Sequence, residues 1–183
     1  MSSKRRGNRS SEKEIRNLIN SKTFKEKVQK GQKEALSTTD LESMLQNVKN
    51  FLGVFPCDRI KFIKCSFTIP KFMIVNLDSS LSEGSHWLAL RIDSKSVEIF
   101  DSLGYNPRIW KILPVPLLQF LNKLLKTRKK IITPILQTKY DTLCGLFCVY
   151  FILFRKIKTF PQCLSVFNRS LELNKKILIN HLS

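Results

Sequence analysis

The chain has 183 residues, of which 43% are hydrophobic, and this length and composition fit one folded domain with its own core. The most apolar stretch, from Leu146 to Phe154, is far too short to cross a bilayer, so we expect no membrane contact. Lys and Arg outnumber Asp and Glu by 32 to 14, and the formal net charge of +18 predicts contact with a polyanion, with a lysine-rich bias in composition as the alternative.

The cysteines are odd in number, form no paired CxxC units and lack nearby histidines. They are Cys57, Cys65, Cys144, Cys148 and Cys163. This pattern argues against a zinc site, and we expect no metal. The chain begins with a polar, basic stretch rather than an apolar signal segment. We therefore expect a reducing compartment and no disulfide framework.

Residues 1–36 form a basic leader with few apolar side chains. A weak helical pattern places Ile15, Leu18 and Ile19 on one side. The high charge and sparse apolar content predict a partly disordered arm with at most a short helix. We expect this arm either to contact nucleic acid or to be removable, and its deletion to leave residues 37–183 functional. Its first basic side chains are Lys4, Arg5 and Arg6.

The folded domain is expected to begin with a helix capped by Thr39 or Asp40. The apolar side chains of this helix repeat at helical spacing and are Leu41, Met44, Leu45 and Val48. The apolar run from Lys71 to Leu77 is bounded by Pro70 and Asp78 and predicts a buried strand.

A β-hairpin is predicted next. Its strands are Trp87–Ile92 and Ser96–Phe100, and Asp93-Ser-Lys forms the turn, where Asp93 caps backbone amides. His86 then precedes the first strand and Asp101 follows the second. These two ends lie side by side in an antiparallel pair, as a hydrogen bond between imidazole and carboxylate requires.

The second half of the chain alternates helices and one strand. Leucines repeat at helical spacing from Leu117 to Leu125 and predict a helix, which is followed by a strand from Ile131 to Leu136. Residues Gly145–Phe154 are predicted to form a hydrophobic helix, and Phe160–Leu182 one or two further helices that close the core.

Four polar residues supply the groups that hydrolysis by a thiol requires. They are His86, Asp101, Gln137 and Cys144. A thiol needs a base, an imidazole needs a carboxylate that holds its tautomer, and a tetrahedral intermediate needs donors to its oxyanion. His86 is the expected base because the only other histidine, His181, lies two residues from the C-terminus. Cys144 stands where a helix N-terminus favours a thiolate.

Each of these residues has a second interpretation when it is considered alone. Cys144 fits a small core cysteine, His86 a structural histidine and Gln137 a surface glutamine. Asp93 competes with Asp101 for the role of the carboxylate, although a hairpin turn is its expected place. Only the occurrence of all the groups together favours a catalytic site.

The motifs around these residues resemble those of the adenovirus-type cysteine protease family. In order they are His86-Trp, Phe100-Asp-Ser-Leu-Gly, Gln137 and Cys144-Gly-Leu-Phe-Cys. The wider group includes SUMO-deconjugating proteases and the proteases of Maverick/Polinton elements and related DNA viruses. The resemblance covers residues 38–154. Papain-like enzymes place the cysteine before the histidine, so their signature is absent.

The resemblance implies an α+β fold, with helices that flank a central, mainly antiparallel sheet and a nucleophile at the start of a buried helix. It implies a viral or transposon-encoded cysteine endopeptidase with Cys144 as nucleophile and His86 as base. Asp101 would orient the imidazole, and Gln137 would bind the oxyanion together with the Cys144 backbone. The implied substrates are capsid precursor proteins, cut beside small residues such as glycine in the virion and the host nucleus.

The resemblance also bears on cofactors and partners. The chemistry needs no cofactor, but relatives imply that DNA and a viral activating peptide assist it. With the net charge, this favours non-specific DNA binding by a monomer, with Arg128, Lys129 and Lys130 as further candidate contacts.

The chain departs from its relatives in several places. Asp101 stands where the adenovirus enzyme has Glu, as in SUMO proteases, whereas Leu143 replaces the Asp that SUMO-type enzymes carry before the cysteine. No cysteine lies between Thr127 and Leu136, so an activating peptide is not expected to attach there by a disulfide. A deconjugase for SUMO or ubiquitin-like proteins and a catalytically dead DNA-packaging protein remain as alternatives.

Overall fold

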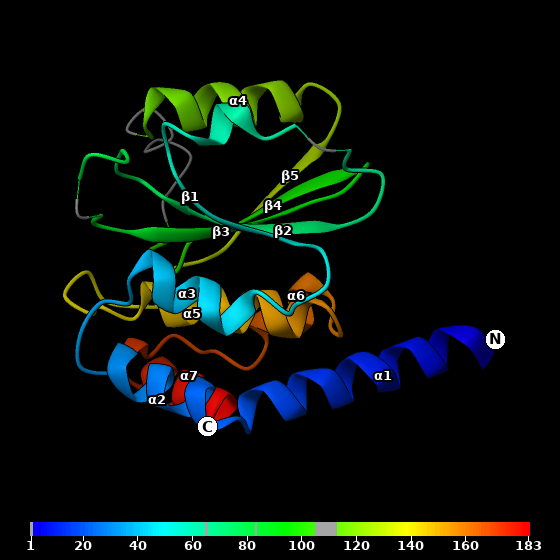
Figure 1. The fold of residues 1–183 in the computed structure, drawn as a ribbon, viewed down its shortest axis with the longest axis vertical. Coiled ribbons are helices and arrows are strands. Elements are labelled where there is room, and N and C mark those ends of the chain that lie inside the picture. The colour runs from blue at the N-terminus through cyan, green and yellow to red at the C-terminus, as the bar shows by residue number, and fades with distance from the viewer. Residues whose placement is uncertain (1, 65, 83, 105–112) are drawn as a thin grey trace.

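The computed structural model describes residues 2–64, 66–82, 84–104 and 113–183, with the side chains of residues 2–8 left out. Three helices begin the described chain, three helices end it, and the strands lie between them (Figure 1). In order they are α1 (Ser2–Ile19), α2 (Lys22–Gly31), α3 (Thr38–Leu45), β1 (Phe51–Pro56), the 3-10 helix η1 (Ile60–Phe62), β2 (Lys71–Asn76), β3 (Trp87–Ile92), β4 (Ser96–Phe100), α4 (Val115–Leu125), β5 (Lys129–Ile132), α5 (Cys144–Arg155), α6 (Phe160–Leu164) and α7 (Leu171–Leu182).

The strands form one sheet in the order β1-β2-β3-β4-β5. The central pairs, β2 with β3 and β3 with β4, are antiparallel, as the predicted hairpin requires. The outer pairs, β1 with β2 and β4 with β5, are parallel. A parallel partner needs a crossover connection, and α4 lies in the connection between β4 and β5. The α+β fold is confirmed, and its sheet is mixed.

The two faces of the sheet carry separate apolar clusters because successive side chains of a strand point to opposite sides. On β3, Leu88 and Leu90 join the cluster that α4 covers, whereas Trp87 and Ala89 join the cluster that contains α5. Figure 1 shows the resulting layers, with α4 on one face and α3, α5 and α6 on the other. Helices α2 and α7 form a further layer beyond α5.

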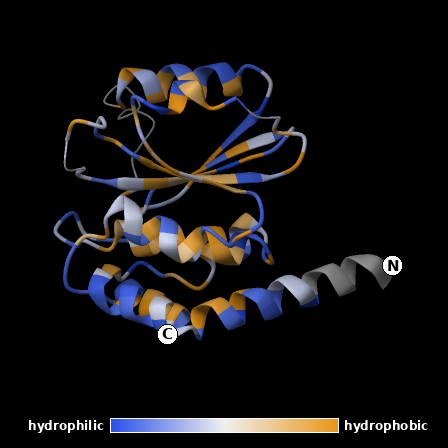
Figure 2. Ribbon diagram, in the orientation of Figure 1, coloured by the Kyte–Doolittle hydropathy of each residue, from blue (hydrophilic) through white to orange (hydrophobic). Residues whose placement is uncertain are grey.

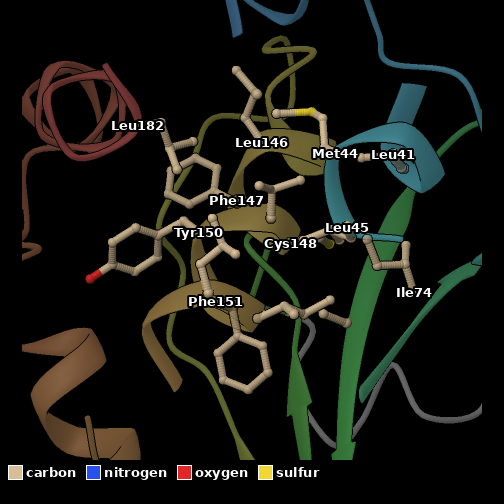
Figure 3. Packing of buried hydrophobic residues seen from close by; sticks show 14 of the residues in the cluster. Leu41, Met44, Leu45, Ile74, Leu146, Phe147, Cys148, Tyr150, Phe151 and Leu182 are labelled. Carbon is tan, nitrogen blue, oxygen red and sulfur yellow. The ribbon is translucent and has the colours of Figure 1, made fainter. Parts of the chain in front are cut away.

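Helix α5 is buried on every side. All residues from Cys144 to Leu153 are buried, and the helix is almost uniformly hydrophobic in Figure 2. Figure 3 shows Phe147 and Tyr150 on the side of α7, while Cys148 lies on the side of α3 and Ile74. A helix enclosed in this way has a fixed position, and its first residue, Cys144, is fixed with it.

The N-terminal segment is more ordered than the sequence indicates. Helices α1 and α2 follow one another, so the prediction of at most a short helix is wrong for this segment. Each helix contributes one pair of residues at i, i+4 to the main core, Ile15 with Ile19 and Phe24 with Val28. Two pairs in a charged background give little signal in a sequence, although they are sufficient for packing.

The last residues of this segment also contact the sheet. The indole Nε1 of Trp87 donates a hydrogen bond of 3.0 Å to the backbone carbonyl of Leu36, and both residues are buried. Trp87 follows His86 directly, so the end of the N-terminal segment is bonded to a residue next to the candidate site. Removal of the whole leader is therefore expected to damage the core, contrary to the expectation from the sequence. The domain boundary at residue 37 stays a prediction.

The N-cap of helix α3 lies two residues before Thr39, the nearer of its two predicted caps. Ser37 is the N-cap, and Asp40 completes a capping box through the backbone and hydroxyl of Ser37. The buried Asp40 carboxylate also accepts hydrogen bonds from Lys27 and Lys30 of α2. Burial raises the pKa of Asp40, but the hydrogen bonds lower it by more, so the pKa lies well below its usual range.

Two strands differ from the sequence prediction. Strand β1 (Phe51–Pro56) was not predicted, and β5 spans Lys129–Ile132 rather than Ile131–Leu136. Pro134 lacks the N–H group that a strand ladder needs. The backbone N–H groups of Leu136 and Gln137 donate to the carbonyl of Ser102, in the turn after β4, instead of to a strand. Within the described part of the chain, no helix has the length and apolarity needed to cross a membrane.

We predict that Phe24→Ala lowers the free energy of unfolding by about 3–5 kcal/mol, because it leaves a cavity at a position that is 2% exposed. Lys25→Ala, at an exposed position of the same helix, should change it by less than about 0.5 kcal/mol. Chemical denaturation measures both values. Equal midpoints for the two variants would show that α2 does not belong to the cooperative core.

Candidate active site

The hairpin brings His86 and Asp101 together as predicted. His86 lies directly before β3 and Asp101 directly after β4, and the register pairs Ala89 with Phe100 near these ends. The Nε2 atom of His86 lies 2.8 Å from Oδ1 of Asp101, and both side chains are buried. The carboxylate thus occupies one ring nitrogen and leaves Nδ1 for another partner.

Cys144 is the first residue of α5 and is buried. The N-cap residue Leu143 makes no side-chain capping bond, so its side chain does not occupy the N–H groups at the positive end of this helix. A Cβ atom on Gly145 would lie 3.3 Å from the side chains of Leu36 and Leu41. The glycine therefore lets the start of α5 pack closely against α3 and the residues before it.

The electrostatics of His86 connect it to both neighbours. Burial by itself lowers the pKa of the imidazole, but hydrogen bonds with Asp101 and Cys144, and the charges of both groups, raise it from 6.5 to about 9. The ring therefore lies between a carboxylate and a thiol, and its protonated form is favoured at neutral pH. This arrangement suits a base that activates a thiol and then donates the proton.

Gln137 is buried beside the turn that carries Asp101. Its backbone N–H, and that of Leu136, donate to the carbonyl of Ser102 at 3.0 and 2.7 Å. In the side chain, Oε1 accepts a hydrogen bond of 2.8 Å from Ser102 Oγ, and Nε2 donates one of 3.2 Å to the carbonyl of Asp141. Gln137 is thus no surface glutamine.

Three supporting residues were not singled out from the sequence. Ser102 holds Gln137, and Thr133 Oγ1 bonds to both the N–H and the carbonyl of Asp101 at 2.8 Å. Asn174 of α7 is fully buried and donates to the carbonyl of Leu136 at 3.1 Å. Ser102 was detectable as a member of the Phe-Asp-Ser-Leu-Gly motif, whereas Thr133 and Asn174 carry no local signal.

Gly104 explains the last position of that motif. Its φ is +61°, and a Cβ atom there would lie 2.4 Å from the backbone nitrogen of Ile135. Its N–H donates to the carbonyl of Asp101 and closes the turn. Only glycine combines this backbone conformation with so close an approach to the segment before Gln137.

Asp93, the alternative carboxylate, and the other described cysteines have structural surroundings. Asp93 accepts bonds from the backbone of Lys95 and Ser96 at 2.8 Å in the hairpin turn, as predicted. Burial raises the pKa of the other described thiols, to about 11 for Cys163 and well above the usual range for Cys148, which fits core cysteines. Cys65 lies outside the described residues.

The candidate DNA contacts have different surroundings. The side chains of Lys4, Arg5 and Arg6 lie outside the described part. Arg128 donates to the carbonyl of Asp93 at 2.6 Å and so ties the hairpin turn to the end of α4. The neighbouring basic side chains, Lys129 and Lys130, are exposed on the outer strand β5. No group of three His, Cys, Asp or Glu residues that could hold a metal ion occurs among the described residues.

Comparison with known proteins finds one family and several similar proteins. Residues 51–178 match the adenovirus endoprotease family. The protease of Bovine adenovirus 7 is 33% identical over 138 residues, which cover 68% of this chain and 66% of that protein, or just under two thirds of its length. Among solved structures, the SUMO protease Ulp1 is similar with a TM-score of 0.48 and 16% identity, covering 94% of this chain and 93% of that one. The ASFV protease has a TM-score of 0.48 and 18% identity, covering 83% of this chain and 69% of that one.

We predict that the two histidines titrate on opposite sides of pH 6.5. His86 should titrate near pH 9, whereas burial, followed by the charge of Lys158, lowers the pKa of His181. NMR of the two imidazole rings measures both values, and His181→Gln assigns the signals. A His86 signal that titrates at or below pH 6.5 would contradict the ion-paired arrangement.

The raised pKa of His86 also predicts how stability depends on pH. The protonated ring is stabilised in the folded state, so its contribution is complete below the unfolded pKa of 6.5 and is lost as the pH rises through about 9. We expect the stability advantage of wild type over Asp101→Asn to shrink across this range. If the unfolding free energies of wild type and Asp101→Asn differed by a constant amount from pH 6 to 10, the raised pKa of His86 would be contradicted.

Proposed function

The chain belongs to the adenovirus endoprotease family, a family of cysteine peptidases, and from this membership we propose that it is a viral cysteine endopeptidase with Cys144 as its nucleophile. The observation that carries the proposal is the position of His86, whose imidazole lies between the Asp101 carboxylate and the Cys144 thiol in a buried site. A raised imidazole pKa favours the imidazolium, and a neighbouring imidazolium is what activates a cysteine nucleophile in such a site.

The proposed reaction begins with attack of the Cys144 thiolate on the carbonyl carbon of the scissile peptide. The C–N bond then breaks, and the imidazolium of His86 gives its Nδ1 proton to the leaving amine. The neutral ring next takes a proton from water, and the resulting hydroxide attacks the thioester. The thiolate leaves, the acid product is released, and the ion pair is restored.

The backbone N–H of Cys144 and the side-chain amide of Gln137 are the proposed donors to the oxyanion. The uncapped start of α5 supports the first assignment, because backbone N–H groups at a helix N-terminus favour negative charge. The second assignment is supported by the buried Gln137 amide, which the protein holds in one orientation. Asp101 keeps the imidazole in place and stabilises its positive charge.

The proposed substrates are capsid or virion precursor proteins, cut beside small residues such as glycine during particle maturation in the virion and the infected nucleus. Family membership supports a viral proteolytic role. Incubation of the protein with the capsid proteins of its own genome, followed by mass spectrometry of the new termini, tests this proposal. Cuts after bulky residues would exclude the glycine preference.

A deconjugase for SUMO or ubiquitin-like proteins is the second candidate. The Asp101-Ser-Leu-Gly turn favours it, since SUMO proteases also carry Asp in this place, whereas Leu143 before the nucleophile does not. A SUMO conjugate and a capsid-derived peptide, offered at equal concentration, separate the two. A catalytically dead DNA-packaging protein would hydrolyse neither.

DNA is proposed as an assisting partner for two reasons. The net charge of the chain is +18, and lysines of β5 are exposed. Enzyme and substrate bound to one polymer meet more often than in bulk solution. An activating peptide, if used, would bind without a disulfide in the segment from Thr127 to Leu136, which has no cysteine.

We predict that Cys144→Ala and His86→Ala abolish peptide cleavage in folded protein. Asp101→Asn and Gln137→Ala should retain measurable activity, because loss of an oxyanion donor lowers kcat by about a hundred- to a thousandfold but leaves the nucleophile and base in place. Steady-state kinetics on a fluorogenic peptide measures these effects. Cys57→Ala, on the opposite face of the sheet, is the control and should retain kcat. Normal turnover by Cys144→Ala would end this assignment.

We also predict binding to duplex DNA of any sequence, with a slope of log affinity against log salt of about −0.9 for each neutralised phosphate. Replacing both Lys129 and Lys130 with Gln should make this slope less steep by about 2. The control replaces Lys176 with Gln, because this exposed lysine of α7 lies outside residues 1–36 and in the layer farthest from α4. Binding that does not respond to salt would show that the charge has another purpose.

A further inference from the structure

The side-chain amide of Gln137 is held at both of its polar atoms. Ser102 Oγ donates to Oε1 at 2.8 Å, and Nε2 donates to the carbonyl of Asp141 at 3.2 Å. Ser102 is 1% exposed and Gln137 is 3% exposed, so water does not compete for these bonds. We propose that Ser102 is a positioning residue that keeps the Gln137 amide nitrogen turned toward the oxyanion. This inference rests on the proposed function.

The need for such a residue follows from the chemistry of an amide. A half turn about its last bond exchanges the acceptor Oε1 with the donor Nε2 and changes the shape very little. In the turned amide, Oε1 would face the carbonyl oxygen of Asp141, which has no hydrogen to donate. The nitrogen would then face Ser102, and the donor would be lost from its place.

Ser102 and Asp141 thus act as a pair that permits one orientation. The Asp141 carbonyl selects the nitrogen, and the Ser102 hydroxyl gives the oxygen its hydrogen bond. A primary amide has two N–H donors, and Asp141 takes one of them. The second N–H remains for the developing charge on the substrate.

Ser102 also links the two halves of the site through its backbone. It directly follows Asp101, and its carbonyl accepts from the N–H groups of Leu136 and Gln137 at 2.7 and 3.0 Å. One residue therefore sets the distance between the carboxylate that orients His86 and the amide that binds the oxyanion. A shift of the Gln137 donor by a fraction of an ångström is sufficient to lower the rate.

A double-mutant cycle of Ser102→Ala and Gln137→Ala in the full chain, with a fluorogenic peptide, tests the proposal. Ser102→Ala is expected to lower kcat by about 10- to 100-fold, while KM changes by less than twofold. In the Gln137→Ala background the same substitution should change kcat by less than about twofold, because the amide it positions is gone. Tyr150→Phe is the matched control: it removes a buried hydroxyl bond of 2.9 Å to the carbonyl of Cys163 and should keep kcat.

A folded Ser102→Ala variant with wild-type kcat would overturn the inference, and so would an equal loss in the Gln137→Ala background. Ser102→Cys, with a weaker donor of similar shape, covers the case in which Ser102→Ala does not fold. A reduced kcat with unchanged KM supports the role, and wild-type kcat overturns it. The proposed function is tested first, by turnover in wild type and its loss in Cys144→Ala. If wild type shows no turnover, the proposed function fails, and this inference fails with it. If wild type turns over and Ser102→Ala keeps wild-type kcat, only the inference fails.

Discussion

The hydrogen bond between His86 Nε2 and Asp101 Oδ1 is the interaction on which the arrangement of the site depends. It joins the start of β3 to the end of β4, so the hairpin register sets its length. Both groups are buried, and a buried carboxylate or imidazolium without a partner is costly. Each group therefore offsets the cost of burying the other, and the hydrogen bond orients the imidazole ring.

The site also needs a nucleophile beside the imidazole. Helix α5 holds Cys144 there because both ends of the helix are fixed. Its first residue, Cys144, lies beside His86. At its other end, Arg155 makes two bonds, of 2.7 and 2.8 Å, to the buried carboxylate of Glu98 on β4. The same strand that leads to Asp101 thus also anchors the far end of the helix. A slip of α5 along its axis would break the ion pair and displace the thiol together.

The N-terminal helices complete this frame from the other side. They cover α5 where the sheet cannot, and the hydrogen bond from Trp87 to Leu36 connects them to the residue next to His86. A basic surface segment and a part of the core are therefore combined in one stretch of chain. The charged side chains of this stretch lie mostly on its outer face, and its few apolar side chains pack on its inner face.

The sequence by itself determined the central hairpin, the hydrophobic helix that begins at Cys144, and the order of the four candidate residues. Alternating and continuous apolar patterns act over a few residues, so they are visible in one short window. Only the tertiary structure decided that β1 and β5 join the sheet in parallel, that α1 and α2 pack into the core, and that Ser102, Thr133 and Asn174 hold the site. These features depend on contacts between residues far apart in the chain, for example Asn174 with Leu136, and no local pattern encodes a partner at such a distance.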